Sequence, residues 1–331
     1  MENIKKYFAG ANTSLGFYNL FNNIIDNSKE SFLYILKGGP GTGKSTLMKK
    51  VAKHFLLKGE EVECFYCSSD SASLDGVRIV SKNIAIVDGT APHLSNPKII
   101  GITDKIINLG DYIIDDILSC KDVISKLTEE KSNHFKIAYN YLGIAGNLYK
   151  TNNILLQEYV SDDLVNNEIN KILAKYNLNR LSKKGTSREL FLNVFEKKDS
   201  DFINQNYSDI LYVSNNQLLN ELTFNKLKGI LVDFGYDTID FKNLLNPTST
   251  DAIYIKEIDK LIKRKDCIFP TKQIKANQKE IDNAISNAIK SLEDAKSKHL
   301  EIEKYYISHM DFQGIDSETN KLLKTLDSKI K

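Results

Sequence analysis

Short apolar runs alternate with amphipathic stretches along the first third of the chain, which is typical of an α/β protein. Three of these runs end at a polar or glycine-containing turn and are predicted to be buried strands: 31–37, 61–67 and 83–88. Between the first two, residues 46–57 place Leu47, Val51 and Phe55 at intervals of four. This spacing predicts a helix with one apolar face packed against a sheet.

The turn between the first predicted strand and this helix carries the clearest chemical signal. It reads GGPGTGKS (38–45) and fits the pattern G-x-x-x-x-G-K-[ST] in its strand–loop–helix context. Glycines let backbone N–H groups point at phosphate oxygens, and the helix N-terminus adds positive charge. Lys44 would reach the β- and γ-phosphates, and Ser45 would bind Mg²⁺. We therefore expect ATP and Mg²⁺ to bind here, through Gly38, Gly39, Pro40, Gly41, Thr42, Gly43, Lys44, Ser45 and Thr46.

Carboxylates follow the other two predicted strands. Asp88 comes after four apolar residues, where P-loop proteins hold Mg²⁺ through water. Asp70 follows the second strand, and ligands of open α/β sheets lie at the carboxyl ends of strands. We expect Lys44, Asp88 and Asp70 to be catalytic, with Asp70 positioning a water or substrate hydroxyl. Asp75 and His93 are weaker candidates for the same surroundings, and a turn residue and a loop histidine explain them equally well.

The second half of the chain repeats the pattern of the first at an offset of 176 residues. Gly59 falls on Gly235 and Asp75 on Asp251, without a gap. Over the phosphate loop, however, the second copy reads SNNQLLNE (214–221), and Glu221 would repel phosphate. We expect an α/β P-loop NTPase fold with a mainly parallel sheet, duplicated, with one live and one degenerate site. The alternative is an unrelated second domain that shares a helix–strand pattern by coincidence.

Helical periodicity follows each copy, over 134–149 and 284–312. The expected organisation therefore has four segments. It comprises an active P-loop module (1–110), a helical connecting segment (111–183), a degenerate P-loop-like module (184–275) and a C-terminal helical segment packed on the modules (276–331).

Composition limits the classes of partner. The 45 basic and 43 acidic residues leave a net charge of +2, which argues against a nucleic-acid-binding surface. No apolar run is long enough for a membrane span, no signal peptide is recognisable, and four scattered cysteines do not form a disulfide framework, so a cytoplasmic location is expected. The chain contains four arginines, at positions 78, 180, 188 and 264. That is few for the closing lid of a kinase.

Four segments carry a resemblance to a known family: KGGPGTGKSTLMKK, CSSDSASLDGV, IAIVDGTAPH and HLEIEKYYISHMDF. They resemble poorly characterised bacterial ATP-binding proteins, common in Firmicutes, that contain two tandem P-loop modules and are described as ATPases or nucleotide kinases. The resemblance covers most of the chain and is strongest over 8–110. It implies a phosphate loop in each half, and this chain has lost the second.

The expected function is that of a cytoplasmic Mg²⁺-ATP-binding P-loop protein that hydrolyses ATP slowly, because no glutamate follows Asp88. A nucleoside or small-molecule kinase is one alternative, and a non-catalytic, ATP-dependent switch or adaptor is another. ATP is the expected partner. A homo-oligomer or a partner protein would supply any arginine that the site lacks.

Overall fold

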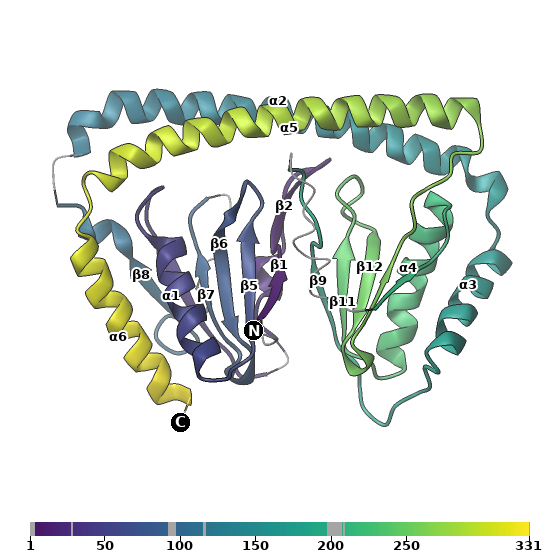
Figure 1. The fold of residues 1–331 in the computed structure, drawn as a ribbon, viewed down its shortest axis with the longest axis horizontal. Helices are drawn as coiled ribbons and strands as arrows, with labels where there is room; N and C mark the ends of the chain where they lie inside the picture. Colours follow the sequence, from purple (N-terminus) through teal and green to yellow (C-terminus); the bar gives the residue numbers. More distant parts are fainter. Residues whose placement is uncertain are drawn as a thin grey trace. The chain divides into compact units, whose positions relative to one another are not determined.

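The computed structural model describes residues 4–27, 29–91, 97–114, 117–196, 207 and 209–330. It confirms an α/β fold, with two mixed sheets and covering helices (Figure 1). The chain separates into two compact units. The first comprises Met1–Gly10, Asn19–Ile137 and Lys290–Lys331, and the second comprises Ala11–Tyr18 and Ala138–Ile289.

The sheet of the first unit has six strands in the order β1-β5-β6-β7-β4-β8. Their bounds are β1 (Ile4–Tyr7), β4 (Phe32–Lys37), β5 (Val62–Cys67), β6 (Asp70–Ile79), β7 (Ile84–Asp88) and β8 (Asp104–Asn108). The sheet is mixed, because β6 runs antiparallel to both neighbours while the other pairings are parallel. The expectation of a mainly parallel sheet is therefore met by the other pairings but not by those of β6. The reason is the two-residue connection between β5 and β6, which is long enough for an antiparallel hairpin but not for a parallel crossover.

Helix α1 (Lys44–Leu57) fills the core of the first unit as the apolar spacing predicts. Leu47, Val51 and Phe55 are at most 1% exposed and pack with the strands. Leu322 and Leu326 of α6 (Phe312–Ile330) join the same cluster. The last turns of α5 (Lys272–Ile307) and the first turns of α2 (Lys121–Leu155) also belong to this unit.

The sheet of the second unit has five strands in the order β10-β13-β12-β11-β9. Their bounds are β9 (Ser187–Leu190), β10 (Ile210–Tyr212), β11 (Thr238–Lys242), β12 (Thr250–Ile255) and β13 (Lys260–Lys263). The order and directions match those of β4-β7-β6-β5-β1 in the first unit. The registers also correspond at an offset of 176, since Val62 pairs with Ile79 and Thr238 with Ile255. The β10–β13 pairing is shifted by one residue and the β9–β11 pairing by seven.

Helix α4 (Gln217–Asp233) packs on this second sheet through Phe224, Leu227 and Leu231, and α3 (Asp162–Lys175) lies against α4. The strands β2 (Gly10–Thr13) and β3 (Gly16–Asn19) form a separate hairpin. Short 3₁₀ helices occur at Phe21–Asn23, Val80–Lys82, Leu109–Tyr112, Ile117–Cys120, Gln157–Tyr159 and Lys256–Ile258.

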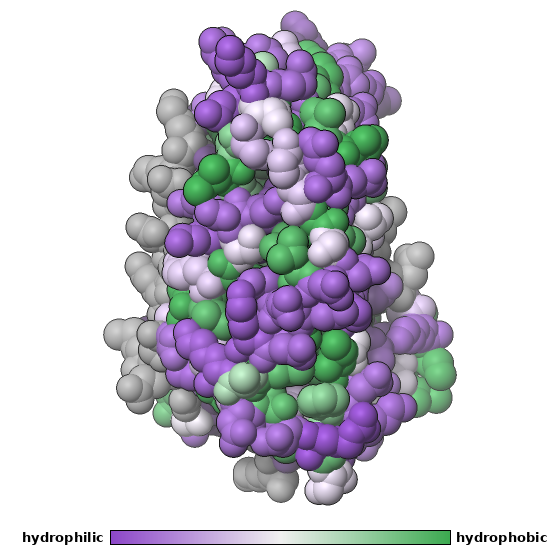
Figure 2. Space-filling model, turned by 90° about the vertical axis from the view of Figure 1, so that its right-hand side faces the viewer, coloured by the Kyte–Doolittle hydropathy of each residue, from purple (hydrophilic) through white to green (hydrophobic). Residues whose placement is uncertain are grey.

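Within the described ranges, no helix is both long and apolar enough to cross a bilayer. The face shown in Figure 2 mixes hydrophilic residues with scattered hydrophobic ones.

Candidate functional site

The loop that joins β4 to α1 has the conformation that its glycines allow. Gly41 and Gly43 have φ angles of 72° and 85°, in the left-handed region that favours glycine. A Cβ atom on Gly38 would lie 2.6 Å from the Oγ1 atom of Thr42. Gly43 is the N-cap of α1 and makes no side-chain cap, so the first N–H groups of the helix stay available to an anion. The loop is therefore a backbone cradle that side chains would fill.

Lys44 lies at the centre of this loop. Its Nζ atom donates to the carbonyl oxygens of Gly38 and Gly39, at 2.7 and 2.8 Å, and lies 3.6 Å from Oδ2 of Asp88. The two side chains are only 11% and 12% exposed. The fold thus brings together two residues that the sequence predicts for one site, 44 positions apart in the chain.

Asp88 ends β7, next to β4 in the sheet. Its Oδ1 atom accepts hydrogen bonds from the backbone N–H and the hydroxyl of Thr90, which leaves Oδ2 facing Lys44. A Cβ atom on the next residue, Gly89, would collide with Ile35, so the Asp-Gly pair is required by close packing as well as by the turn.

The hydroxyl residues of the loop have different surroundings. Ser45 accepts a hydrogen bond from the backbone N–H of Leu74 at 2.9 Å and keeps its second lone pair and its own proton for other partners. Thr42 donates to the carbonyl of Gly39 at 2.9 Å and holds the loop closed. Thr46, also predicted to contact nucleotide, is exposed.

Asp70 begins β6 and pairs with the last residue of β5, so it lies at the carboxyl end of β5, as the sequence predicts. It is not free, because Lys296 of α5 donates to its Oδ1 at 2.8 Å and Ser73 to its Oδ2 at 2.6 Å. Burial alone would raise the pKa of Asp70, but the hydrogen bonds from Lys296 and Ser73 outweigh it and hold the pKa below its ordinary value. Asp75 is buried within β6, and His93 lies outside the described residues.

The Asp70–Lys296 pair predicts a specific pH response. Because the pKa of Asp70 is lowered in the folded state, its contribution to stability is complete above the unfolded value of about 3.9 and is lost as the pH falls through the folded value. In Lys296→Met, burial should dominate and the pKa of Asp70 should rise. Carbon NMR titration of the aspartate carboxyls measures the pKa of Asp70 in the wild type and in the variant. Lys298→Met is the control, since Lys298 pairs with Glu130, and an unchanged Asp70 pKa in Lys296→Met would contradict the assignment.

The loop is also packed from outside by residues distant in the sequence. A Cβ atom on Gly39 would lie 2.5 Å from the ring of Tyr306, and one on Gly41 would lie 3.0 Å from the carbonyl oxygen of Glu303. These neighbours come from the end of α5. The helical pattern of this segment predicts a helix, but nothing in it indicates that the helix would support the phosphate loop.

Arginine is scarce around this site. Arg78 is the sole arginine in the first unit, within the described ranges, and its guanidinium is buried against Glu63 at 3.0 Å and Asn83 at 3.1 Å. The other three arginines belong to the second unit. Arg78 therefore holds the sheet together and does not reach a phosphate.

Within the described ranges, no group of three or more His, Cys, Asp and Glu side chains is placed to hold a metal ion. Mg²⁺ commonly binds one or two protein oxygens together with phosphate oxygens and water. Ser45 and Asp88 fit that role beside the phosphate loop.

The corresponding positions of the second unit are occupied by a different network. Glu221, at the offset position of Ser45, accepts from Asn153 at 3.0 Å, from Asn246 at 2.9 Å and from the Tyr149 hydroxyl at 3.3 Å. Asn216 caps α4 by accepting from the N–H of Leu219. The helix start that binds phosphate in a P-loop is thus closed by side chains here.

Comparison with known proteins gives one local similarity. The family model described as Nephrocystin 3, N-terminal, matches residues 18–86. This segment contains β4, the phosphate loop, α1, β5 and β6, but less than half of the chain, so it does not assign the whole protein to that family. No curated protein and no solved structure matches the chain.

Proposed function

We propose that the first unit is a P-loop nucleotide-binding module that takes Mg²⁺-ATP, and that the protein hydrolyses ATP slowly. The observation that carries the proposal is the position of Lys44. Its ammonium lies inside a glycine cradle at a helix N-terminus, 3.6 Å from the carboxylate of Asp88. This combination of backbone donors, lysine and carboxylate is what a nucleoside triphosphate with its metal requires.

The residues have distinct roles in this proposal. Lys44 would transfer its hydrogen bonds from the loop carbonyls to phosphate oxygens and stabilise charge on the transferred phosphoryl group. Ser45 and Asp88 would hold Mg²⁺, which supplies positive charge between the β- and γ-phosphates. Asp70 can orient a water, but its pairing with Lys296 makes it a weak base. Slow turnover follows from this pairing and from the buried pairing of Arg78 with Glu63.

We also propose that the second unit is a duplicated and degenerate copy of the first. Support comes from the matching strand order, from the registers at an offset of 176, and from left-handed residues at equivalent positions, Asn83 and Asp259, each with a φ of 50°. The network around Glu221 then replaces the phosphate site. A homo-oligomer or a partner protein would be the source of a catalytic arginine.

The test is phosphate release from Mg²⁺-ATP, measured over a range of protein concentrations. Asp88→Asn should reduce turnover about 100-fold, the effect of removing one group that stabilises transition-state charge. Asp122→Asn, at an exposed position of α2, is the matched control and should keep wild-type turnover.

The other outcomes separate the alternatives. Turnover per molecule that rises with protein concentration would indicate a site completed by a second chain. Tight ATP binding without phosphate release would contradict the ATPase and favour the switch, which the pairing of Asp70 with Lys296 also supports. ATP consumed only when an acceptor is added would indicate a kinase.

A further inference from the structure

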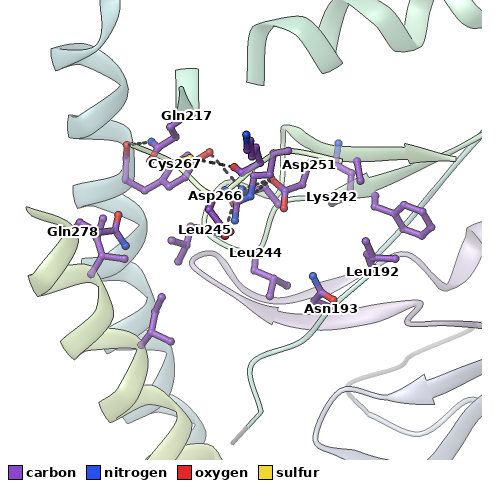
Figure 3. Close-up of a pocket in the computed structure, with 18 of the residues that line it drawn as sticks. Leu192, Asn193, Gln217, Lys242, Leu244, Leu245, Asp251, Asp266, Cys267 and Gln278 are labelled. Atoms are coloured by element: carbon purple, nitrogen blue, oxygen red, sulfur yellow. Dashed lines mark hydrogen bonds and ion pairs between the residues drawn. The ribbon is translucent and has the colours of Figure 1, made fainter. Parts of the chain in front are cut away.

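The second unit contains a cavity of about 280 Å³ that the proposed nucleotide site does not explain (Figure 3). It lies where the segments after β9, β11 and β13 meet the start of α4. These three strands run parallel to one another, so the cavity lies at their carboxyl ends. Ligands of open α/β sheets bind at the carboxyl ends of the strands. The position therefore favours a binding site over a packing defect.

One part of the cavity wall is apolar and partly aromatic, and the remainder is polar. Leu244 and Leu245 reach it from the segment after β11, Ile281 and Ile285 from α5, and Tyr149 and Phe269 add rings. In Figure 3, Gln278 projects from the helical side, opposite Asp251 and Lys242 on the strand side. Small-molecule sites likewise combine apolar surface with placed polar groups, and a volume of 280 Å³ is just below their usual range of about 300–1,000 Å³.

The charged groups of the cavity are already paired. Nε of Arg264 lies 3.1 Å from Asp251, and Lys242, whose side chain is 3% exposed, lies 3.1 Å from Glu189. The remaining charges, on Lys265 and Asp266, are exposed, adjacent in the chain and opposite in sign. An ionic ligand beside this pair would meet both Arg264 and Asp251, so its attraction to one charge would be offset by repulsion from the other. The cavity therefore suits an uncharged molecule.

A phosphate chain is disfavoured for a second reason. At the offset of 176, Asn220 stands at the position of Lys44, and the side chain of Asn216 already caps the start of α4, where a phosphate would bind. By contrast, the half-buried amide of Asn193 lines the cavity, and its side chain makes no hydrogen bond within the described ranges. An amide offers two donors and an acceptor to the edge of a ligand.

We propose that this cavity binds a small, uncharged heteroaromatic molecule, with its ring against the apolar wall and its polar edge on Asn193. Cys267 lines the same cavity as a free thiol and provides the readout. Burial raises the pKa of this thiol, so its alkylation by N-ethylmaleimide should be slow and should be measured at pH 8.5. Peptide mass spectrometry follows the rate at each cysteine separately.

The probes are adenosine, guanosine, uridine and indole, each at millimolar concentration with the full chain. At least one should slow the modification of Cys267 five-fold or more and leave that of Cys120, in the first unit, unchanged. AMP and inorganic phosphate should not protect. Protection by the charged probes as strong as by the neutral ones, or by none of the four, would overturn the proposal.

Two variants test the contact itself. Asn193→Leu should abolish protection, because the ligand loses its hydrogen-bonding partner. Gln278→Leu, on the opposite side, serves as the matched control, since its amide already donates to Asp282. Full protection in Asn193→Leu would exclude the proposed contact. Tyrosine near-ultraviolet circular dichroism shows whether each variant keeps its fold.

Discussion

Lys44→Ala is expected to weaken Mg²⁺-ATP binding by at least about 100-fold, since hydrogen bonds to charged groups contribute about 1.5–3 kcal/mol each and this ammonium would contact two phosphates in the proposed site. Isothermal titration calorimetry with a slowly hydrolysed ATP analogue measures the change. The loop should survive the substitution, because Thr42 still closes it and Thr90 still holds Asp88.

Lys53→Ala is the matched control for this experiment. Lys53 is an exposed lysine of the same helix, α1, nine residues further along. The Lys53→Ala variant should bind nucleotide with the same affinity as the wild type. If Lys44→Ala also retained full affinity, the phosphate loop would not be the nucleotide site, and the function proposed above would fail with it.

The largest effect on stability is expected from Arg78→Met. Arg78 and Glu63 lie on neighbouring strands, β6 and β5, with side chains only 5% exposed and a separation of 3.0 Å. Removing one partner of such a pair leaves a buried charge and costs about 3–5 kcal/mol. Urea unfolding of the first unit, followed by circular dichroism, should show the loss.

The double variant Arg78→Met with Glu63→Leu separates the charge from the packing. Because it removes both charges together, it should recover most of the lost free energy of unfolding. A double variant as unstable as the single one would show that side-chain volume, rather than the ion pair, sets the stability here.

Local patterns predicted the features that depend on neighbours in the chain. The strand–loop–helix around Lys44 and the apolar face of α1 follow from spacing alone, and the offset of 176 anticipated the matching registers of the antiparallel strand pairs in the two sheets. The strands β1, β2 and β3 were not predicted. Their sequences, IKKY, GANT and GFYN, have no apolar run, and β1 owes its place to pairing with β5.

Contacts between distant residues could not be read from the sequence. Asp70 looks like a free carboxylate after a strand until Lys296, 226 positions later, is seen to bind it. The cavity beside the amide of Asn193 arises from three separate strand ends, and no local pattern records their meeting. The sheet is mixed because a two-residue connection joins β5 to β6 as a hairpin. Composition alone does not distinguish this hairpin turn from the beginning of a longer loop.

The packing of Tyr306 and Glu303 on the phosphate loop has a consequence for how the protein is made. A ribosome that has synthesised the first 110 residues has produced the whole glycine motif, yet the support of Gly39 and Gly41 is still almost 200 residues away. At about 5–20 residues per second, the nascent loop waits about 10–40 seconds for that support. Nucleotide binding would thus begin only late in synthesis, and a shortened chain would carry the motif without a formed site.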